Sequence, residues 1–169
     1  MLALFTRLRH FWLGLRLLPG LMTNANQRQL LAEMRAVSRQ LPDILKQPIP
    51  KAMMQLETMV LARPFSLPPE NKTRQLADLA ALLDRRSPLG LCLRRSLLRY
   101  RYMHELGVPV TVLFGAKFAP GETANVKKIL GHAWLVRGER PYHEDDLNWQ
   151  GYTIMLRWPT ESAPGDVNR

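Results

Sequence analysis

The stretch that decides the fold reads Leu89-Gly-Leu-Cys92-Leu-Arg-Arg-Ser-Leu-Leu-Arg-Tyr-Arg-Tyr-Met-His-Glu-Leu106-Gly107. Its apolar residues recur at helical spacing, a turn with Pro88 precedes it, and a glycine follows it. Proline before a helix and glycine after it mark the two ends, so we predict a helix that opens at Cys92 and stops at Gly107. Apolar side chains lie on more than one side of this helix, as is usual for a helix in the centre of a domain.

Cys92 is the only cysteine in the chain. In the first turn of a helix its sulfur faces unpaired backbone N–H groups and the positive end of the helix dipole, and both stabilise negative charge on sulfur. A thiol hydrolase or an acyltransferase would place its nucleophile there. A small buried core residue is the alternative.

Composition narrows the class of protein. A chain of 169 residues fits one domain, or one domain with a helical extension. A single cysteine excludes an internal disulfide framework and a zinc site of several cysteines, and the four histidines show no ligand spacing, so we predict no metal. An unpaired reactive thiol suits the cytoplasm. The net charge of +10 would attract an acidic partner, but it is spread along the chain, and we weight general solubility above a specific partner.

Helical patterns fill the first half. Residues 2–22 are amphipathic and basic; arginines interrupt the apolar run, so neither a membrane span nor a signal peptide is predicted. This segment could contact an anionic membrane surface or a partner, although packing against the chain's own domain is favoured. Further helices are expected over 26–46, entered at Asn24 or Asn26 with a kink or stop at Pro42, over 51–62, and from Asn71 or Thr73 to Leu83. A proline-stiffened connector covers 63–70.

After Gly107 the period changes from 3.6 to 2. Strands are predicted over 108–115, 131–137 and 151–158, with 140–142 continuing a hairpin and 118–129 forming a loop. The polar tail 159–169 is expected to be disordered. Helices followed by sequential, antiparallel strands define an α+β fold.

A cysteine, a histidine and a carboxylate, which act together in thiol catalysis, follow one another along the chain. Alternation along the second strand puts His132, Trp134 and Val136 on one face, and Glu144 comes twelve residues after His132. In thiol chemistry a cysteine attacks, an imidazole transfers the proton, and a carboxylate orients the imidazole. Cys92, His132 and one of the carboxylates Glu144, Asp145 and Asp146 are therefore the candidate catalytic residues.

The segments Gly90-Leu-Cys-Leu-Arg-Arg, Leu106-Gly-Val-Pro-Val-Thr-Val-Leu-Phe-Gly115 and Gly131-His-Ala-Trp-Leu-Val136, followed by Glu144, resemble the transglutaminase-like cysteine peptidases of lasso-peptide biosynthesis, the B proteins that act as leader peptidases. The resemblance covers roughly residues 70–158. It implies a transglutaminase-like, papain-like core, with Cys92 as nucleophile and His132 as general base. The family often has Asp where Glu144 stands, so Asp145 and Asp146 remain alternative acids.

The resemblance also implies a division of the chain and a set of partners. Residues 1–69 would be a helical N-terminal region, 70–158 the catalytic core and 159–169 the tail. The substrate would be a ribosomal precursor peptide, with a separate leader-recognition protein, since residues 1–85 show no strand-rich winged-helix module. An asparagine-synthetase-like macrocyclase would act downstream. Some members depend on ATP, but no phosphate loop is visible, so no ATP site is predicted.

Two other functions stay open. The same site could transfer the acyl group to an amine, as transglutaminases do, or the chain could be a non-catalytic binder of basic character for peptides or membrane surfaces. No motif supports specific nucleic-acid binding. Arg94 and Arg95 could hold an acidic peptide, although a solvated or structurally paired face is favoured. Trp134 could wall a peptide subsite or pack in the core.

Overall fold

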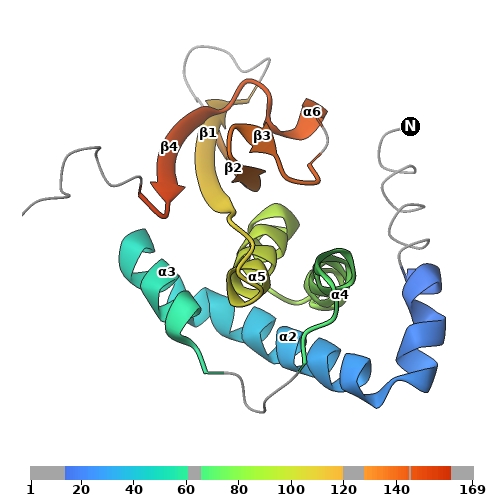
Figure 1. The fold of residues 1–169 in the computed structure, drawn as a ribbon. Coiled ribbons are helices and arrows are strands. Elements are labelled where there is room, and N and C mark those ends of the chain that lie inside the picture. The colour runs from blue at the N-terminus through green and yellow to red at the C-terminus, as the bar shows by residue number, and fades with distance from the viewer. Residues whose placement is uncertain (1–13, 61–65, 120–127, 145, 161–169) are drawn as a thin grey trace, which may run out of the picture. The chain divides into compact units, whose positions relative to one another are not determined.

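The structure is a computed structural model that describes residues 14–60, 66–119, 128–144 and 146–160. The chain forms two compact units, Met1–Val108 and Pro109–Arg169, and each is described by itself. Helices make up the first unit, and an antiparallel sheet with one short helix makes up the second (Figure 1). This order confirms the predicted α+β class. The proposed division at residues 69/70 and 158/159 stays a prediction.

The first unit contains α2 (Ala25–Ile44), α3 (Ile49–Thr58), α4 (Glu70–Leu83) and α5 (Leu91–Glu105). Helix α5 packs against α4, α2 and α3, and Figure 1 shows α4 and α5 side by side along α2. The shared core is made of fully buried aliphatic side chains from all four helices: Leu30, Met34, Leu41, Met53, Leu56, Leu76, Leu97 and Leu98. This packing holds the helix that carries Cys92.

The helix ends follow local chemistry. The side chain of Asn24 caps α2 by accepting the N–H of Gln27 at 3.2 Å, and Gly107 after α5 has φ +69°, as predicted for a helix-ending glycine. Helix α3 differs from the prediction over 51–62. It begins at Ile49 with Pro50 inside its first turn, where a missing N–H costs nothing, and it ends at Thr58. Pro42 lies inside α2, two residues before its end.

Helix α5 carries three buried arginines, Arg94, Arg99 and Arg101. Arg99 donates to both carboxylate oxygens of Asp78 on α4, at 2.5 and 2.8 Å, and Arg101 donates to the carbonyl of Met59 at 2.6 Å and to Glu105 at 2.8 Å. Two-point arginine–carboxylate pairs fix orientation as well as distance. These contacts therefore set how α5 is rotated against its neighbours.

Two tyrosines on the same helix differ in their partners. The Tyr100 hydroxyl donates to Glu57 on α3, whereas the buried hydroxyl of Tyr102 has no hydrogen-bond partner among the described residues. Burial, and secondly the charge of Glu33, raise the pKa of Tyr102 well above its usual value. Tyr102 therefore acts as a core side chain that stays neutral.

The second unit is a sheet of β1 (Thr111–Phe118), β2 (Ile129–Arg137), β3 (Arg140–Pro141) and β4 (Thr153–Trp158), with α6 (Asp146–Trp149) before β4. The strand order is β3-β2-β1-β4, and all pairs are antiparallel. The last strand in sequence therefore pairs with the first, on the side away from β2.

The strand bounds and α6 correct the predictions from sequence. Strand β1 starts at Thr111 and not at 108, because Pro109 has no N–H to give to a ladder. It runs to Phe118, and β2 begins at Ile129, so both extend into the segment predicted as loop. Strand β4 begins at Thr153, after Gly151 at φ +77°. Helix α6 was not predicted, because its four residues are too few to show a period.

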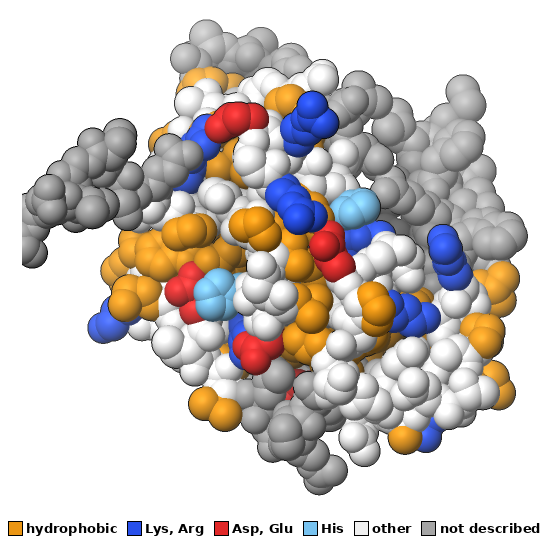
Figure 2. Space-filling model, in the orientation of Figure 1, with side chains coloured by type: hydrophobic (Ala, Val, Ile, Leu, Met, Phe, Trp, Pro, Cys, Tyr) orange, Lys and Arg blue, Asp and Glu red, His pale blue; other side chains and the backbone are white. Residues whose placement is uncertain are grey.

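The amphipathic segment predicted over residues 2–22 is described by the structure only from residue 14 onward. Residues 14–23 are helical, and the rest of 2–22 lies outside the described residues. Among the described helices, none has the length and apolar character needed to cross a membrane. On the face drawn in Figure 2, the Lys and Arg side chains lie in several separate places and do not form one basic patch. Most of the predicted disordered tail, 161–169, also lies outside the described residues.

Candidate active site

Cys92 is the second residue of α5 and is partly buried. The first intrahelical bond at this end runs from the N–H of Arg94 to the carbonyl of Gly90, at 3.2 Å. The N–H groups of the first turn, that of Cys92 included, have no acceptor within the helix. They are donors that a developing oxyanion next to the sulfur could use.

The loop that leads to Cys92 is tied down by Arg94. Its guanidinium donates to the carbonyls of Ala81 at 2.7 Å and Leu89 at 3.1 Å, and also to the carbonyl of Asp84. The residue is only 7% exposed, so this arginine closes the connection between α4 and α5. The geometry supports the structural reading of Arg94 over the substrate-binding one. Arg95 is half-buried on the next position of the helix.

His132 lies on β2 among aromatic rings. Its ring stacks on Trp134, with centroids 5.6 Å apart and planes at 19°, and lies 5.2 Å from the ring of Tyr152. The shared face of His132 and Trp134 is the one predicted from strand alternation. Tyr152 precedes β4, and the ammonium of Lys117 lies over the Tyr152 ring, 4.1 Å from its centroid. These rings limit how far the imidazole can turn.

The β2–β3 hairpin brings Glu144 back to His132. Arg137 pairs with Arg140 and Val136 with Pro141, and the N–H of Tyr142 then donates to Leu135 at 2.8 Å. Each further residue therefore lies one position farther back along β2, toward its beginning. The hairpin thus returns the chain toward the part of β2 that contains His132, and Glu144 lies three residues beyond the last paired residue, Pro141.

The carboxylate of Glu144 faces the imidazole. Oε1 of Glu144 lies 3.8 Å from Nε2 of His132, with the two side chains 1% and 10% exposed. This separation is an ion-pair distance, longer than a charge-assisted hydrogen bond. Catalytic contacts are often long in structures without substrate and tighten when it binds.

Two residues near Glu144 affect the position of its carboxylate, and one of them, Asn148, was not expected from the sequence. Asn148 on α6 donates to the same Oε1 at 3.3 Å, and His143 has φ +51°, a left-handed conformation that turns the chain directly before the carboxylate. In the sequence, only its position next to Glu144 drew attention to His143. Asn148 could not be found in this way, because the four residues of α6 are too few to show a helical period. The carboxylate is thus held from both flanking segments.

Gly115 makes room for the aromatic group. It pairs with His132 across the β1–β2 ladder, and a Cβ at this position would lie 2.8 and 2.9 Å from ring atoms of Trp134 and 3.0 Å from Tyr152. Such approaches are shorter than van der Waals contact. Beyond it, Leu113, Trp134 and Val136 form a buried cluster on this face, packed with Trp149 and Tyr152. Only a residue without a side chain lets the indole lie across β1.

The structure brings together part of the predicted site. His132 lies in contact with Glu144 and Trp134 within the second unit. Cys92, Arg94 and Arg95 belong to the first unit. Of the alternative acids, Asp145 lies outside the described residues, and Asp146 begins α6 with a side chain that is not described. The catalytic roles, and the approach of the sulfur to the imidazole, stay predictions.

The comparison with family models identifies the class. A model described as the transglutaminase-like superfamily matches residues 1–157, so the chain belongs to this superfamily. Its members are in general thiol enzymes. No curated protein and no solved structure matched the chain. Within the described residues, no group of three or more His, Cys, Asp or Glu could hold a metal ion.

Proposed function

We propose that this protein is a cysteine peptidase that removes the leader from a ribosomally synthesised precursor peptide, using Cys92, His132 and Glu144. The observation that carries the proposal is the buried pair of His132 and Glu144 at 3.8 Å. It occurs in a chain of a thiol-enzyme superfamily whose only cysteine opens a helix. An imidazole held against a carboxylate is the support that a thiol nucleophile requires.

The proposed chemistry follows from the atoms involved. The sulfur of Cys92 attacks the peptide carbonyl carbon, and the imidazole of His132 takes the thiol proton. The C–N bond then breaks, and the same imidazole gives the proton to the leaving amine. Water hydrolyses the resulting thioester and restores the thiol. Because Nε2 faces Glu144, the proposal assigns these proton transfers to Nδ1.

A substrate-free experiment tests the pairing of Cys92 and His132. The chain has a single cysteine, so alkylation by iodoacetamide, followed by mass spectrometry of the intact protein, reports on that thiol alone. We expect His132→Ala to slow alkylation near neutral pH by about tenfold, because the imidazole no longer takes the proton. His104→Ala, a matched change on α5, should leave the rate unchanged. Equal rates in all three proteins would refute the pairing.

A second experiment tests the peptidase activity. The substrate is a short precursor peptide encoded beside the gene, incubated with the wild-type protein, Cys92→Ala and His132→Ala, and the products are weighed by mass spectrometry. Cleavage by Cys92→Ala at the wild-type rate would remove the proposal. A leader-recognition protein and an asparagine-synthetase-like macrocyclase, encoded nearby, are the partners proposed with it.

Acyl transfer to an amine is the second candidate, and the superfamily match favours it, because transglutaminase chemistry replaces water by an amine at the thioester. Both reactions use the same three residues. Adding a primary amine to the cleavage assay separates them. A product heavier than the hydrolysed peptide by the mass of the amine minus one water indicates transfer, and a product with a free carboxylate indicates hydrolysis.

A further inference from the structure

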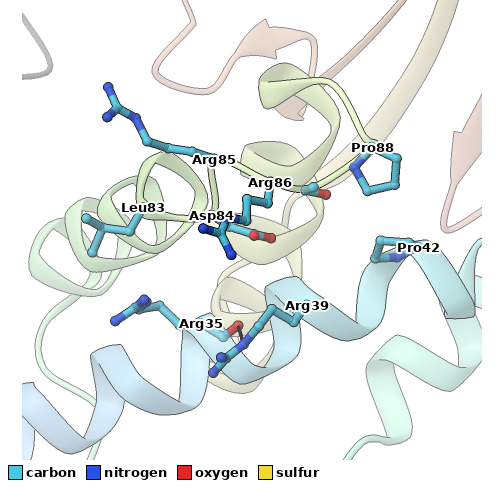
Figure 3. A pocket seen from close by; sticks show the side chains of 9 residues that line it. Arg35, Arg39, Pro42, Leu83, Asp84, Arg85, Arg86 and Pro88 are labelled. Atoms are coloured by element: carbon cyan, nitrogen blue, oxygen red, sulfur yellow. Dashed lines mark hydrogen bonds between the residues drawn. The ribbon is translucent and has the colours of Figure 1, made fainter.

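A pocket of about 610 Å³ lies in the first unit between α2 and the loop from α4 to α5. Four arginines line it: Arg35 and Arg39 from α2, and Arg85 and Arg86 from the loop. Figure 3 shows the two pairs coming from opposite sides, with Arg85 extending away from α2. The one carboxylate in the lining belongs to Asp84.

These arginines differ from those in the core of the unit. Arg35, Arg85 and Arg86 form no ion pair with any described residue, and Arg39 donates only to the backbone carbonyl of Arg35, at 3.3 Å (Figure 3). Asp84 does not neutralise them, because its carboxylate already accepts from Ser38 at 3.0 Å and lies 3.9 Å from Arg94. The pocket thus gathers positive charge that the described part of the protein leaves uncompensated.

The rest of the lining indicates what kind of anion fits. Leu83, Pro42 and Pro88 add apolar surface beside the guanidinium groups. A peptide presents carboxylates and aliphatic carbon together, and a guanidinium binds a carboxylate through two parallel hydrogen bonds. A phosphate is usually cradled by backbone N–H groups of a glycine-rich turn, and this lining contains no glycine. The chemistry therefore favours an acidic peptide.

The pocket also lies close to the proposed nucleophile. Pro88 precedes Cys92 by four residues, and an extended chain advances at most about 3.5 Å per residue, so their Cα atoms are within about 14 Å. A peptide segment of a few residues spans the same distance. Both groups belong to the first unit, so this argument needs nothing from the second.

We propose that the pocket between Arg35, Arg39, Arg85 and Arg86 binds acidic side chains of the peptide substrate, a few residues from the bond that is cleaved. Its role in cleavage rests on the proposed peptidase function, but its binding of acidic peptide does not. The test is fluorescence anisotropy with a fluorescein-labelled hexaglutamate peptide, which measures binding to the full chain without any cleavage. A hexaglutamine peptide controls for backbone binding.

The variants separate the pocket from the net charge. Arg39→Gln with Arg86→Gln should weaken hexaglutamate binding about tenfold. The control pair, Arg16→Gln with Lys51→Gln, removes the same charge from exposed positions outside the pocket and should change binding less than about twofold. Circular dichroism verifies that both proteins are folded.

Three results would overturn the proposal: equal losses in the two variants, equal binding of hexaglutamine, or displacement of the peptide by inorganic phosphate but not by chloride of the same ionic strength. The last result would identify a phosphate site. None of them bears on the alkylation experiment, so a failure of the pocket and a failure of the proposed active site are distinguishable.

Discussion

The buried pair of Asp78 and Arg99 should be the most sensitive point of the helical unit. The side chains are 10% and 3% exposed, and two hydrogen bonds of 2.5 and 2.8 Å join them. Charge centres about 4 Å apart interact by about 4 kcal/mol at the effective dielectric constant of such sites. Removing one partner of a buried pair typically costs 3–5 kcal/mol, because the other charge stays buried and uncompensated. We therefore expect Asp78→Ala to lower the free energy of unfolding by about 3–5 kcal/mol.

Thermal unfolding followed by circular dichroism measures this effect. For a chain of this size the expected loss lowers Tm by roughly 6–20 °C. Asp43→Ala is the matched control, since Asp43 pairs with Lys46 at 2.7 Å on the surface, and its Tm should change by less than about 2 °C. Replacing both partners, by Asp78→Leu and Arg99→Met, should recover part of the loss, because the guanidinium of Arg99 is then no longer buried without its carboxylate. The recovery is incomplete because Arg74, 14% exposed, also donates to Asp78 at 3.3 Å and keeps its charge. Similar Tm values for Asp78→Ala and Asp43→Ala would refute the reasoning.

Three further changes test other parts of the molecule. Gly115→Ala places a Cβ about 3 Å from a buried indole and should cost about 1–3 kcal/mol in urea unfolding; unchanged stability would show that the aromatic group is not tightly packed. Tyr102→Phe should leave Tm unchanged or raise it, whereas Tyr100→Phe, which loses a hydrogen bond to a carboxylate, should cost about 1–3 kcal/mol; the reverse order would contradict the assigned partners. Glu144→Gln should slow peptide cleavage by about 10²–10⁴ without lowering Tm, and the exposed control Glu139→Gln should keep wild-type rates; full activity of Glu144→Gln would exclude this acid.

Much of the second unit could be read from strand alternation. The period of two correctly placed His132 and Trp134 on one face, and the predicted hairpin after β2 returns the chain toward His132. The pairing of β4 with β1 could not be read in the same way, because strand order depends on partners far apart in sequence. The need for glycine at position 115 was also invisible, since it comes from a ring on the neighbouring strand.

The burial of the arginines of α5 could not be predicted from the sequence either. By sequence, Arg94 belongs to a charged helix face that could meet solvent or substrate. In the structure it is buried, because carbonyl oxygens at the end of α4 and in the following loop surround it. Arg99 is buried for an equivalent reason, with Asp78 opposite it. Helical periodicity says which side chains share a face, but not which acceptors that face will meet.

By itself the sequence determined that a helix ends just before Gly107, that Cys92 lies in the first turn of this helix, and that His132 and Trp134 share one face of a strand. These depend on capping groups and on residue periods that act within a few positions of the chain. Only the tertiary structure decided which arginines lie buried against carboxylates and carbonyls, which line an open pocket, and how closely Glu144 approaches the imidazole. The physical reason is that desolvation and pairing of charge depend on groups from distant parts of the chain, and folding alone brings them together.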